Sequence, residues 1–322
     1  MTDLVTFGET PLRFSPPENE RLEQVRETRV HADGTESNVA CAAHELETET
    51  TWLSKLPDTP LGRRVVSQIR SRGVETEIAW TDEEGPGQGL VFREPAEPPR
   101  ESRRWHSRTD TAAASASPSD FPMERIQQAE MLFTGLLTPA LGEEIAETTQ
   151  AMVRAGHSSG TRTAIDIDYA PGLAPADTYR GVFDILSENV DILFGNVADI
   201  RAVLDYSGGA RELANVIAAE YDFDIIVVTR SDLGAVALHD SPGTNLIYER
   251  DALDSNPVDT TGQHDAFVGA FLSELLDGAE VAHALNVAVA AAALARTIEG
   301  PLLITTAGEL EPLVDRVAEN SR

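Results

Sequence analysis

The hydrophobic positions of this 322-residue chain follow two alternating patterns between residues 131 and 229. Short apolar runs rich in Val and Ile are separated by stretches with helical spacing. We expect strands at 131–135, 163–168, 190–194 and 225–229 and helices at 140–157, 178–188, 197–205 and 209–220. Such runs are typical of a parallel sheet that is buried on both faces. Right-handed crossovers then predict an α/β fold, in which two helical layers sandwich one mostly parallel sheet.

The first third of the chain is less regular. The elements expected there are strands at 4–8, 51–54, 76–81, 88–93 and 105–108 and helices at 37–46 and 61–72. Residues 10–32 are rich in proline and charge, and we expect them to be irregular. A turn-rich, charged insert at 94–104 separates two of the strands, so this part of the chain is predicted to form a hairpin.

Candidate chemistry is concentrated in residues 256–272. Pro257 excludes a helix at the start of this stretch, Gly262 allows a tight turn, and helical spacing begins at Asp265. The stretch is therefore expected to be a loop that leads into the first turn of a helix. The N–H groups of residues 262–265 would then face outward, with the positive end of the helix dipole behind them. Such a helix start binds an anion, typically a phosphate.

Asp265 is unusual in a site of this kind. A carboxylate repels a bound phosphoryl group, unless its purpose is to take a proton from an attacking hydroxyl. The alternative is that Asp265 is an ordinary acidic residue in the first turn of a helix, where the dipole stabilises it. The residues alone leave both interpretations open.

Charge and composition restrict the class of protein. The chain has 54 acidic and 25 basic residues, a formal net charge of −29, and a single lysine, Lys55. This acidic excess, spread along the chain, indicates a protein that works in concentrated salt, and it disfavours nucleic acid and anionic membranes as partners. One cysteine, Cys41, excludes an internal disulfide, and no apolar run approaches the roughly 20 residues of a membrane span. We expect a soluble, cytoplasmic protein.

Two motifs resemble those of a known family. The segment Asp259-Thr-Thr-Gly-Gln-His-Asp-Ala-Phe267 resembles the Asp-Thr-Thr-Gly-Ala-Gly-Asp-Ala-Phe signature of the PfkB, or ribokinase-like, sugar kinases. Asp33-Gly-Thr-Glu-Ser-Asn-Val-Ala40 is similar to their sugar-binding motif Gly-Gly-Ala-x-x-Asn-Val-Ala. The resemblance implies a ribokinase-like αβα sandwich with a small β lid from residues 10–32 and 86–112. It also implies that Gly34 and Asn38 border the sugar; for Asn38 taken alone, the alternative is a helix cap or a first-turn residue.

Further resemblances imply a nucleotide site for ATP. Asn196-Val-Ala-Asp199 is similar to the family's Asn-x-x-Glu motif, which is associated with the water shell of Mg²⁺, and 228–235 resembles the segment that lines the nucleotide phosphates. The residues implied in ATP binding are Asn196, Thr229, Ser231, Gly234, Thr260 and Gly262. Asp199 would hold the metal through water. Helix capping and turn chemistry are the alternative for each motif taken alone.

The branch that the chain resembles most is that of the 2-keto-3-deoxygluconate kinases, through Gly8-Glu-Thr-Pro-Leu-Arg-Phe-Ser15 and Trp52-Leu-Ser-Lys-Leu56. The resemblance implies transfer of the γ-phosphoryl group of ATP to a hydroxyl of a sugar acid. Asp265 would accept the proton, and the anion hole would be formed by Gly262, Gln263 and His264. Gln263 and His264 depart from the family signature, which has Ala and Gly there.

The substrate shell departs further from that branch. The resemblance implies that Arg108 and Asp168 lie at the sugar, whereas Arg100, Arg103 and Arg104 are expected at a solvated hairpin tip. The branch's carboxylate-binding arginine is replaced by Ala170, and its lid tyrosines by Val91 and His106. A kinase of fructose, ribose or a nucleoside, and a catalytically impaired binding homologue, therefore stay open as alternatives. Family members often pair through the lid, so a homodimer is a further expectation.

Overall fold

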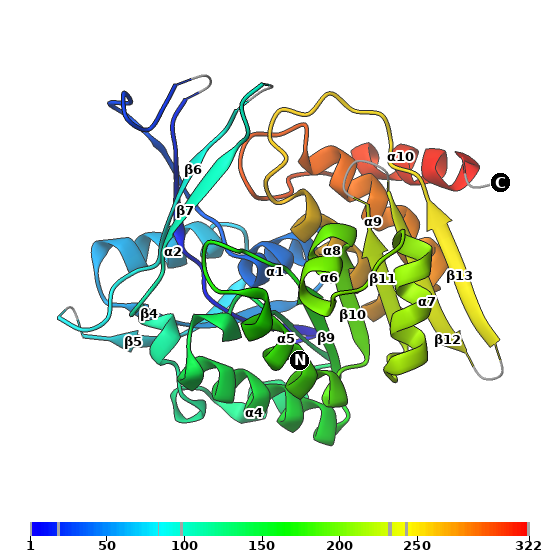
Figure 1. Ribbon diagram of the computed structural model, residues 1–322, viewed down its shortest axis with the longest axis horizontal. Helices are drawn as coiled ribbons and strands as arrows, with labels where there is room; N and C mark the ends of the chain where they lie inside the picture. The colour runs from blue at the N-terminus through cyan, green and yellow to red at the C-terminus, as the bar shows by residue number, and fades with distance from the viewer. Residues whose placement is uncertain are drawn as a thin grey trace.

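The computed structural model describes residues 2–17, 20–82, 84–96, 99–230, 234–241 and 244–320. Within these residues a nine-stranded sheet runs through the molecule (Figure 1). Its strands, in spatial order, are β13 (Thr244–Arg250), β12 (Ala235–Ser241), β11 (Ile225–Thr229), β10 (Ile192–Asn196), β9 (Arg162–Ile167), β8 (Met131–Gly135), β1 (Leu4–Phe7), β4 (Thr50–Pro57) and β5 (Glu75–Thr81). All neighbours from β11 to β5 are parallel, and β12 and β13 form an antiparallel edge.

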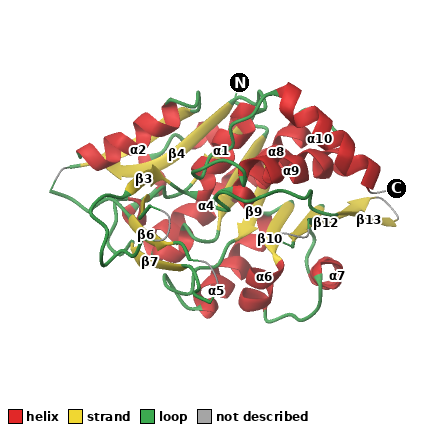
Figure 2. Cartoon of the chain, turned by 90° about the horizontal axis from the view of Figure 1, so that it is seen from above, coloured by secondary structure: helices red, strands yellow, loops and turns green. Residues whose placement is uncertain are grey.

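Helices cover both faces of this sheet (Figure 2). One layer contains α1 (Thr35–Glu45), α2 (Pro60–Arg70), α8 (Gln263–Leu276), α9 (Val281–Ala295) and α10 (Ala307–Asn320); the other contains α3 (Met123–Gln128), α4 (Glu143–Ser159), α5 (Ala176–Leu186), α6 (Val197–Leu204) and α7 (Ala210–Glu220). Strand β11 shows why both faces are apolar. Ile225 and Val227 pack in the core of the first layer, while Ile226 and Val228 pack in the core of the second. The predicted α/β sandwich is confirmed.

A second, smaller sheet projects from one end of the main sheet (Figure 1). It is formed by β3 (Arg29–Ala32), β2 (Leu12–Ser15), β6 (Leu90–Glu94) and β7 (Arg103–Ser107), in that order. The expectation that 10–32 is irregular was wrong for its two ends. These four-residue strands carry charged residues and lack a clear alternation, so only their pairing with each other and with β6 reveals them.

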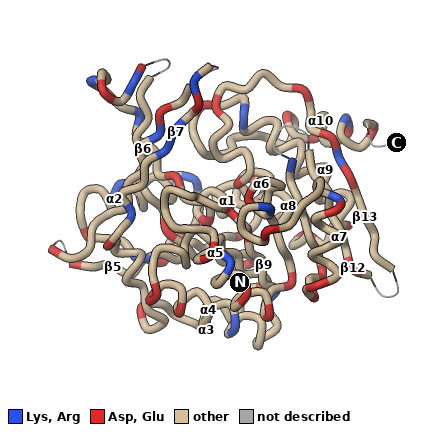
Figure 3. The backbone as a smooth tube through the Cα atoms, viewed as in Figure 1, with Lys and Arg blue, Asp and Glu red and all other residues tan. Residues whose placement is uncertain are grey.

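Four further α-helices and strands were not expected from the sequence: α3, β12, β13 and α10. The acidic residues are distributed over most of the elements, as Figure 3 shows. Among the described residues, no helix combines the length and the apolar character needed to cross a lipid bilayer.

Candidate active site

A cleft of about 630 Å³ lies between the carboxyl ends of the main-sheet strands and the small sheet. Ligands of open α/β sheets bind at this edge. Most of the residues singled out in the sequence line it: Gly34, Arg108, Asp168, Asn196, Asp199, Thr260, Gly262, Gln263, His264 and Asp265. The structure therefore brings together segments that are up to 231 positions apart (Gly34 to Asp265).

The start of α8 faces this cleft, as predicted. Gly262 is the N-cap residue, with a φ of 75°, a left-handed conformation that favours glycine. A Cβ at this position would lie 1.9 Å from the carbonyl oxygen of Pro301, so no larger residue fits without moving the backbone. The first N–H groups of a helix have no partner within it, and here the residues that carry them line the cleft.

Asp265 lies in the first turn of α8 and points into the cleft. Its Oδ2 accepts a hydrogen bond of 2.8 Å from Nδ2 of Asn38, which also donates to Asp33 at 3.0 Å. Burial, assisted by the charge of Asp33, raises the pKa of Asp265 to about 8, although the Asn38 hydrogen bond opposes the shift. Asn38 itself is buried behind Asp265 and does not line the cleft. A carboxyl group with this pKa can exchange a proton near neutral pH.

His264 forms an ion pair with Asp166 at the floor of the same cleft. Its Nε2 lies 3.0 Å from both carboxylate oxygens of Asp166, and its Nδ1 lies 3.4 Å from Oγ1 of Thr229. Burial alone would lower the pKa of His264, but the charge and hydrogen bond of Asp166 outweigh it and raise the pKa to about 9. The imidazole is therefore held in its charged form at neutral pH.

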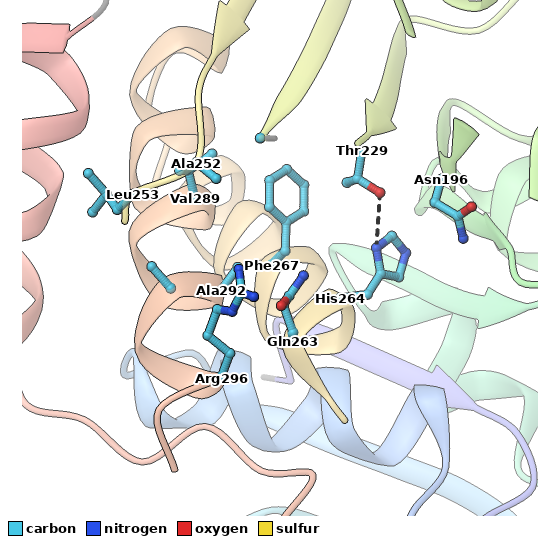
Figure 4. A pocket seen from close by; sticks show the side chains of 12 residues that line it. Asn196, Thr229, Ala252, Leu253, Gln263, His264, Phe267, Val289, Ala292 and Arg296 are labelled. Carbon is cyan, nitrogen blue, oxygen red and sulfur yellow. Dashed lines mark hydrogen bonds between the residues drawn. The ribbon is translucent and has the colours of Figure 1, made fainter. Parts of the chain in front are cut away.

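A smaller hollow of about 90 Å³ adjoins the cleft and shares Asn196, Gln263 and His264 with it. Figure 4 shows the residues that line it. Thr229 and Asn196 lie at one end of it, and the polar side chains of Gln263 and Arg296 line it as well. Its apolar wall comes from the segment after β13 and from α8 and α9: Ala252, Leu253, Phe267, Val289, Ala292 and Ala293. Gly234, predicted for ATP binding, also lines it. Ser231, predicted with it, lies outside the described residues. A hollow with apolar walls and a few polar side chains suits a planar base that carries a charged tail.

Asn196 lines both the cleft and the hollow, whereas Asp199 lines the cleft alone. Asn196 is the N-cap of α6, and its Oδ1 accepts from the N–H groups of Ala198 and Asp199 at 2.9 Å each. Burial and then the nearby Asp168 raise the pKa of Asp199 to about 7. Across the described part of the chain, no group of three or more His, Cys, Asp or Glu side chains is close enough to bind a metal directly.

Three side chains of the β7 segment line the opposite wall of the cleft: Arg104, His106 and Arg108. They are spaced by two residues and so share one face of the strand. Arg104 was expected at a solvated hairpin tip, and this expectation was wrong. Its side chain is exposed but borders the cleft. Arg100 instead pairs with Glu94, 3.7 Å away, as expected for the hairpin.

Glu9 and Glu36 are site residues that the sequence did not single out as binding residues. Glu9 is buried and pairs with Arg108, and its Oε1 has no hydrogen-bond partner among the described residues. Glu36 accepts from the N–H of Gly135 at 3.0 Å and from Oγ1 of Thr138 at 2.7 Å. Burial raises the pKa of Glu36 to about 7. Both acids belong to motifs quoted above, one after the end of β1 and the other at the start of α1. Their position in these motifs was the sequence signal that could have identified them as site residues.

Arg13 links the small sheet to the loop that precedes α8. Its side chain is only 2% exposed; Nε lies 3.2 Å from Asp33, and Nη2 lies 3.8 Å from Asp259. Its Nη1 donates to Oγ1 of Thr261 at 2.5 Å. Arg93 of the neighbouring strand also pairs with Asp259, at 3.2 Å. Two guanidinium groups therefore hold the loop that leads into the start of α8.

Comparisons with known proteins identify the family of this chain. Residues 1–305 match the model of the pfkB family carbohydrate kinase. The chain is 42% identical over 309 residues to a 2-dehydro-3-deoxygalactonokinase of Haloferax volcanii, a match that covers 96% of this chain and 95% of the relative. It is 27% identical over 305 residues to a 2-dehydro-3-deoxygluconokinase of Thermoproteus tenax, covering 93% and 90%.

A solved structure resembles the whole fold. The crystal structure of 2-dehydro-3-deoxygluconokinase from Thermotoga maritima superposes with a TM-score of 0.87 at 27% identity, covering 98% of this chain and all of the other. The family match spans far more than half of the chain, and the Haloferax relative is similar along nearly its whole length. The chain therefore belongs to the pfkB family of carbohydrate kinases.

Proposed function

We propose that this kinase transfers the γ-phosphoryl group of ATP to a terminal hydroxyl of a 2-keto-3-deoxy sugar acid. One observation carries the proposal: Asp265 and the N-terminal turn of α8 face the same cleft. A hydroxyl placed there meets a proton acceptor on one side and an anion-binding helix start on the other. The substrate class follows from the names of the two relatives and from the cationic wall of the cleft.

In this mechanism the chain positions the reactants and neutralises charge. Asp265 takes the proton of the attacking hydroxyl, and Asn38 keeps its carboxylate in place. The N–H groups of residues 262–265 stabilise the charge that develops on the transferred phosphoryl group. Mg²⁺ would supply further positive charge at the nucleotide phosphates, and Asp199, which lines the cleft, would hold it through water.

We infer that Arg104 and Arg108 bind the carboxylate of the sugar acid, in place of the arginine that Ala170 replaces. Removing either guanidinium deletes a charge-assisted hydrogen bond of about 1.5–3 kcal/mol. Arg104→Leu and Arg108→Leu should therefore each raise the KM for the sugar acid about 10- to 100-fold and leave the KM for ATP unchanged.

Steady-state kinetics of the two variants test this assignment. Arg103→Leu is the matched control, because residue 103 is in the same strand, on the face opposite to residues 104 and 106. An unchanged sugar-acid KM in both cleft variants, or an equal change in the control, would contradict the assignment.

The activity should rise as the pH increases through about 8. The pKa of Asp265 is raised to about 8, mainly by burial, and only the ionised carboxylate can accept the hydroxyl proton. Asp33 and Asp168 raise this pKa further, while Asn38 and His264 lower it. Below this pH the base is protonated and the rate falls. A profile of kcat/KM between pH 6 and 9.5 measures the effect, and a flat profile over that range would contradict it.

One panel of candidate substrates distinguishes the two epimers of the sugar acid from each other and from neutral sugars and nucleosides. The sequence predicts 2-keto-3-deoxygluconate as the substrate. The name of the 42% identical relative adds its epimer, 2-keto-3-deoxygalactonate, as a second candidate substrate. An ADP-release assay should show turnover of 2-keto-3-deoxygluconate, 2-keto-3-deoxygalactonate or both, and none of fructose, ribose or nucleosides. Turnover of a neutral sugar alone would replace the proposed substrate. ATP binding without turnover of any compound would indicate an impaired homologue.

We further infer that the enzyme works in the cytoplasm of a cell with concentrated salt, from its net charge of −29. The assay is therefore performed in molar KCl. A homodimer through the small sheet stays a prediction, which sedimentation in the same buffer tests.

A further inference from the structure

His264 stands where the family signature has glycine, and its imidazole lies where the two cavities of the site meet. It belongs to the first turn of α8 and lines both the large cleft and the smaller hollow. Figure 4 shows the ring next to Thr229 and near Asn196, at one edge of the hollow, with Gln263 and Phe267 on the same helix. Any phosphate chain that reaches from the hollow to Asp265 passes this ring.

Asp166 explains why the ring is held there. It is the penultimate residue of β9, it is fully buried, and both of its oxygens lie 3.0 Å from Nε2 of His264. A buried carboxylate without a cation is strongly destabilising, so the pair must form as a unit. On the other side of the ring, the hydroxyl of Thr229 can accept from Nδ1. The doubly protonated imidazolium satisfies both contacts at once.

A cation in the first turn of a helix is opposed by the helix dipole, so His264 does not stabilise α8 by its charge. Its charge acts on the groups around it. His264 lowers the pKa of Asp265, against the charges of Asp33 and Asp168, which raise it. The same charge lies at the helix start where a phosphoryl group would bind.

We propose that Asp166 and His264 are positioning residues for phosphoryl transfer: Asp166 holds His264 as an imidazolium, which adds a fixed positive charge to the phosphate-binding helix start and favours the ionised form of Asp265. This inference rests on the proposed function and assigns a role in it to two residues that act together. It also accounts for the departure from glycine at position 264, since the side chain there brings a positive charge to the helix start and Asp166 keeps that side chain protonated.

Three variants separate this role from a purely structural one. His264→Gln removes the charge and leaves Asp166 buried without a cation, so both kcat and Tm should fall. Asp166→Asn/His264→Gln replaces the ion pair by a neutral pair of similar shape, so Tm should recover. We expect kcat of this double variant to stay about 10- to 100-fold below that of the wild type, at unchanged KM for the sugar acid. Recovery of kcat together with Tm would overturn the proposal.

A measurement that does not depend on activity tests the ion pair itself. The ring ¹⁵N and ¹³C chemical shifts of His264 are assigned by comparison with His264→Gln. In the wild type they should report a protonated ring up to about pH 9. The third variant, Asp166→Asn, should lower the pKa of His264. The charged groups that face the ring are Asp166, Asp265 and Asp168, and each of them raises its pKa. A wild-type ring that titrates near its ordinary value of 6.5 would overturn the proposal. Absence of sugar phosphorylation by the wild type, with a ring still charged at about pH 8, would refute the proposed function and leave the ion pair established.

Discussion

Asp265→Asn is expected to lower kcat by about 10²- to 10⁴-fold, the usual range for removing a general base, and to leave the KM for ATP nearly unchanged. Asparagine has the same shape, and its Oδ1 can still accept the hydrogen bond from Asn38. The variant should therefore fold normally and bind both substrates. Only the capacity to take the hydroxyl proton is lost.

The matched control is Asp177→Asn, which alters an exposed acidic residue in the first turn of α5. If Asp265 were only an ordinary first-turn acid, both substitutions would cost less than about 1 kcal/mol of stability and neither would affect kcat. Steady-state kinetics and thermal unfolding of the two variants decide between these interpretations. An Asp265→Asn enzyme with wild-type kcat would remove the role assigned to the carboxylate.

Arg13→Met is expected to lower the free energy of unfolding by about 3–5 kcal/mol, the usual effect of breaking a buried ion pair. The substitution leaves Asp33 without its guanidinium partner and removes the hydrogen bond to Thr261. Arg93 still pairs with Asp259, so the loop before α8 keeps one of its two guanidinium partners from the small sheet. We expect the KM for ATP to rise as well, because this loop positions the helix start.

Arg29→Met provides the comparison within the same small sheet. Arg29 pairs with Glu299 on the surface, where the side chains are 46% and 45% exposed. Exposed pairs contribute about 0–1 kcal/mol, so this variant should unfold like the wild type. Urea unfolding of both variants at one fixed KCl concentration measures the difference. Equal stabilities of the two variants would show that the buried cluster does not hold the loop.

Much of the fold was predictable because the evidence for it is local. The apolar runs at β8 to β11 and the helical spacing after Asp265 depend on residues within about ten positions of each other. The same holds for the helix start at Gly262, where proline, glycine and periodicity coincide in one short stretch. Strands β2 and β3 lack such signals, since their stability comes from pairing with each other and with β6.

By itself, the sequence determined the α/β class, the acidic surface and the segment that carries Asp265, because periodicity, charge and turn chemistry are properties of neighbouring residues. Only the tertiary structure decided the partners: Arg13 with Thr261 across 248 positions, Arg108 with Glu9 across 99, and His264 with Asp166 across 98. The physical reason is that a buried charge needs a counter-charge in space, and chain order does not specify which distant residue the fold will place beside it.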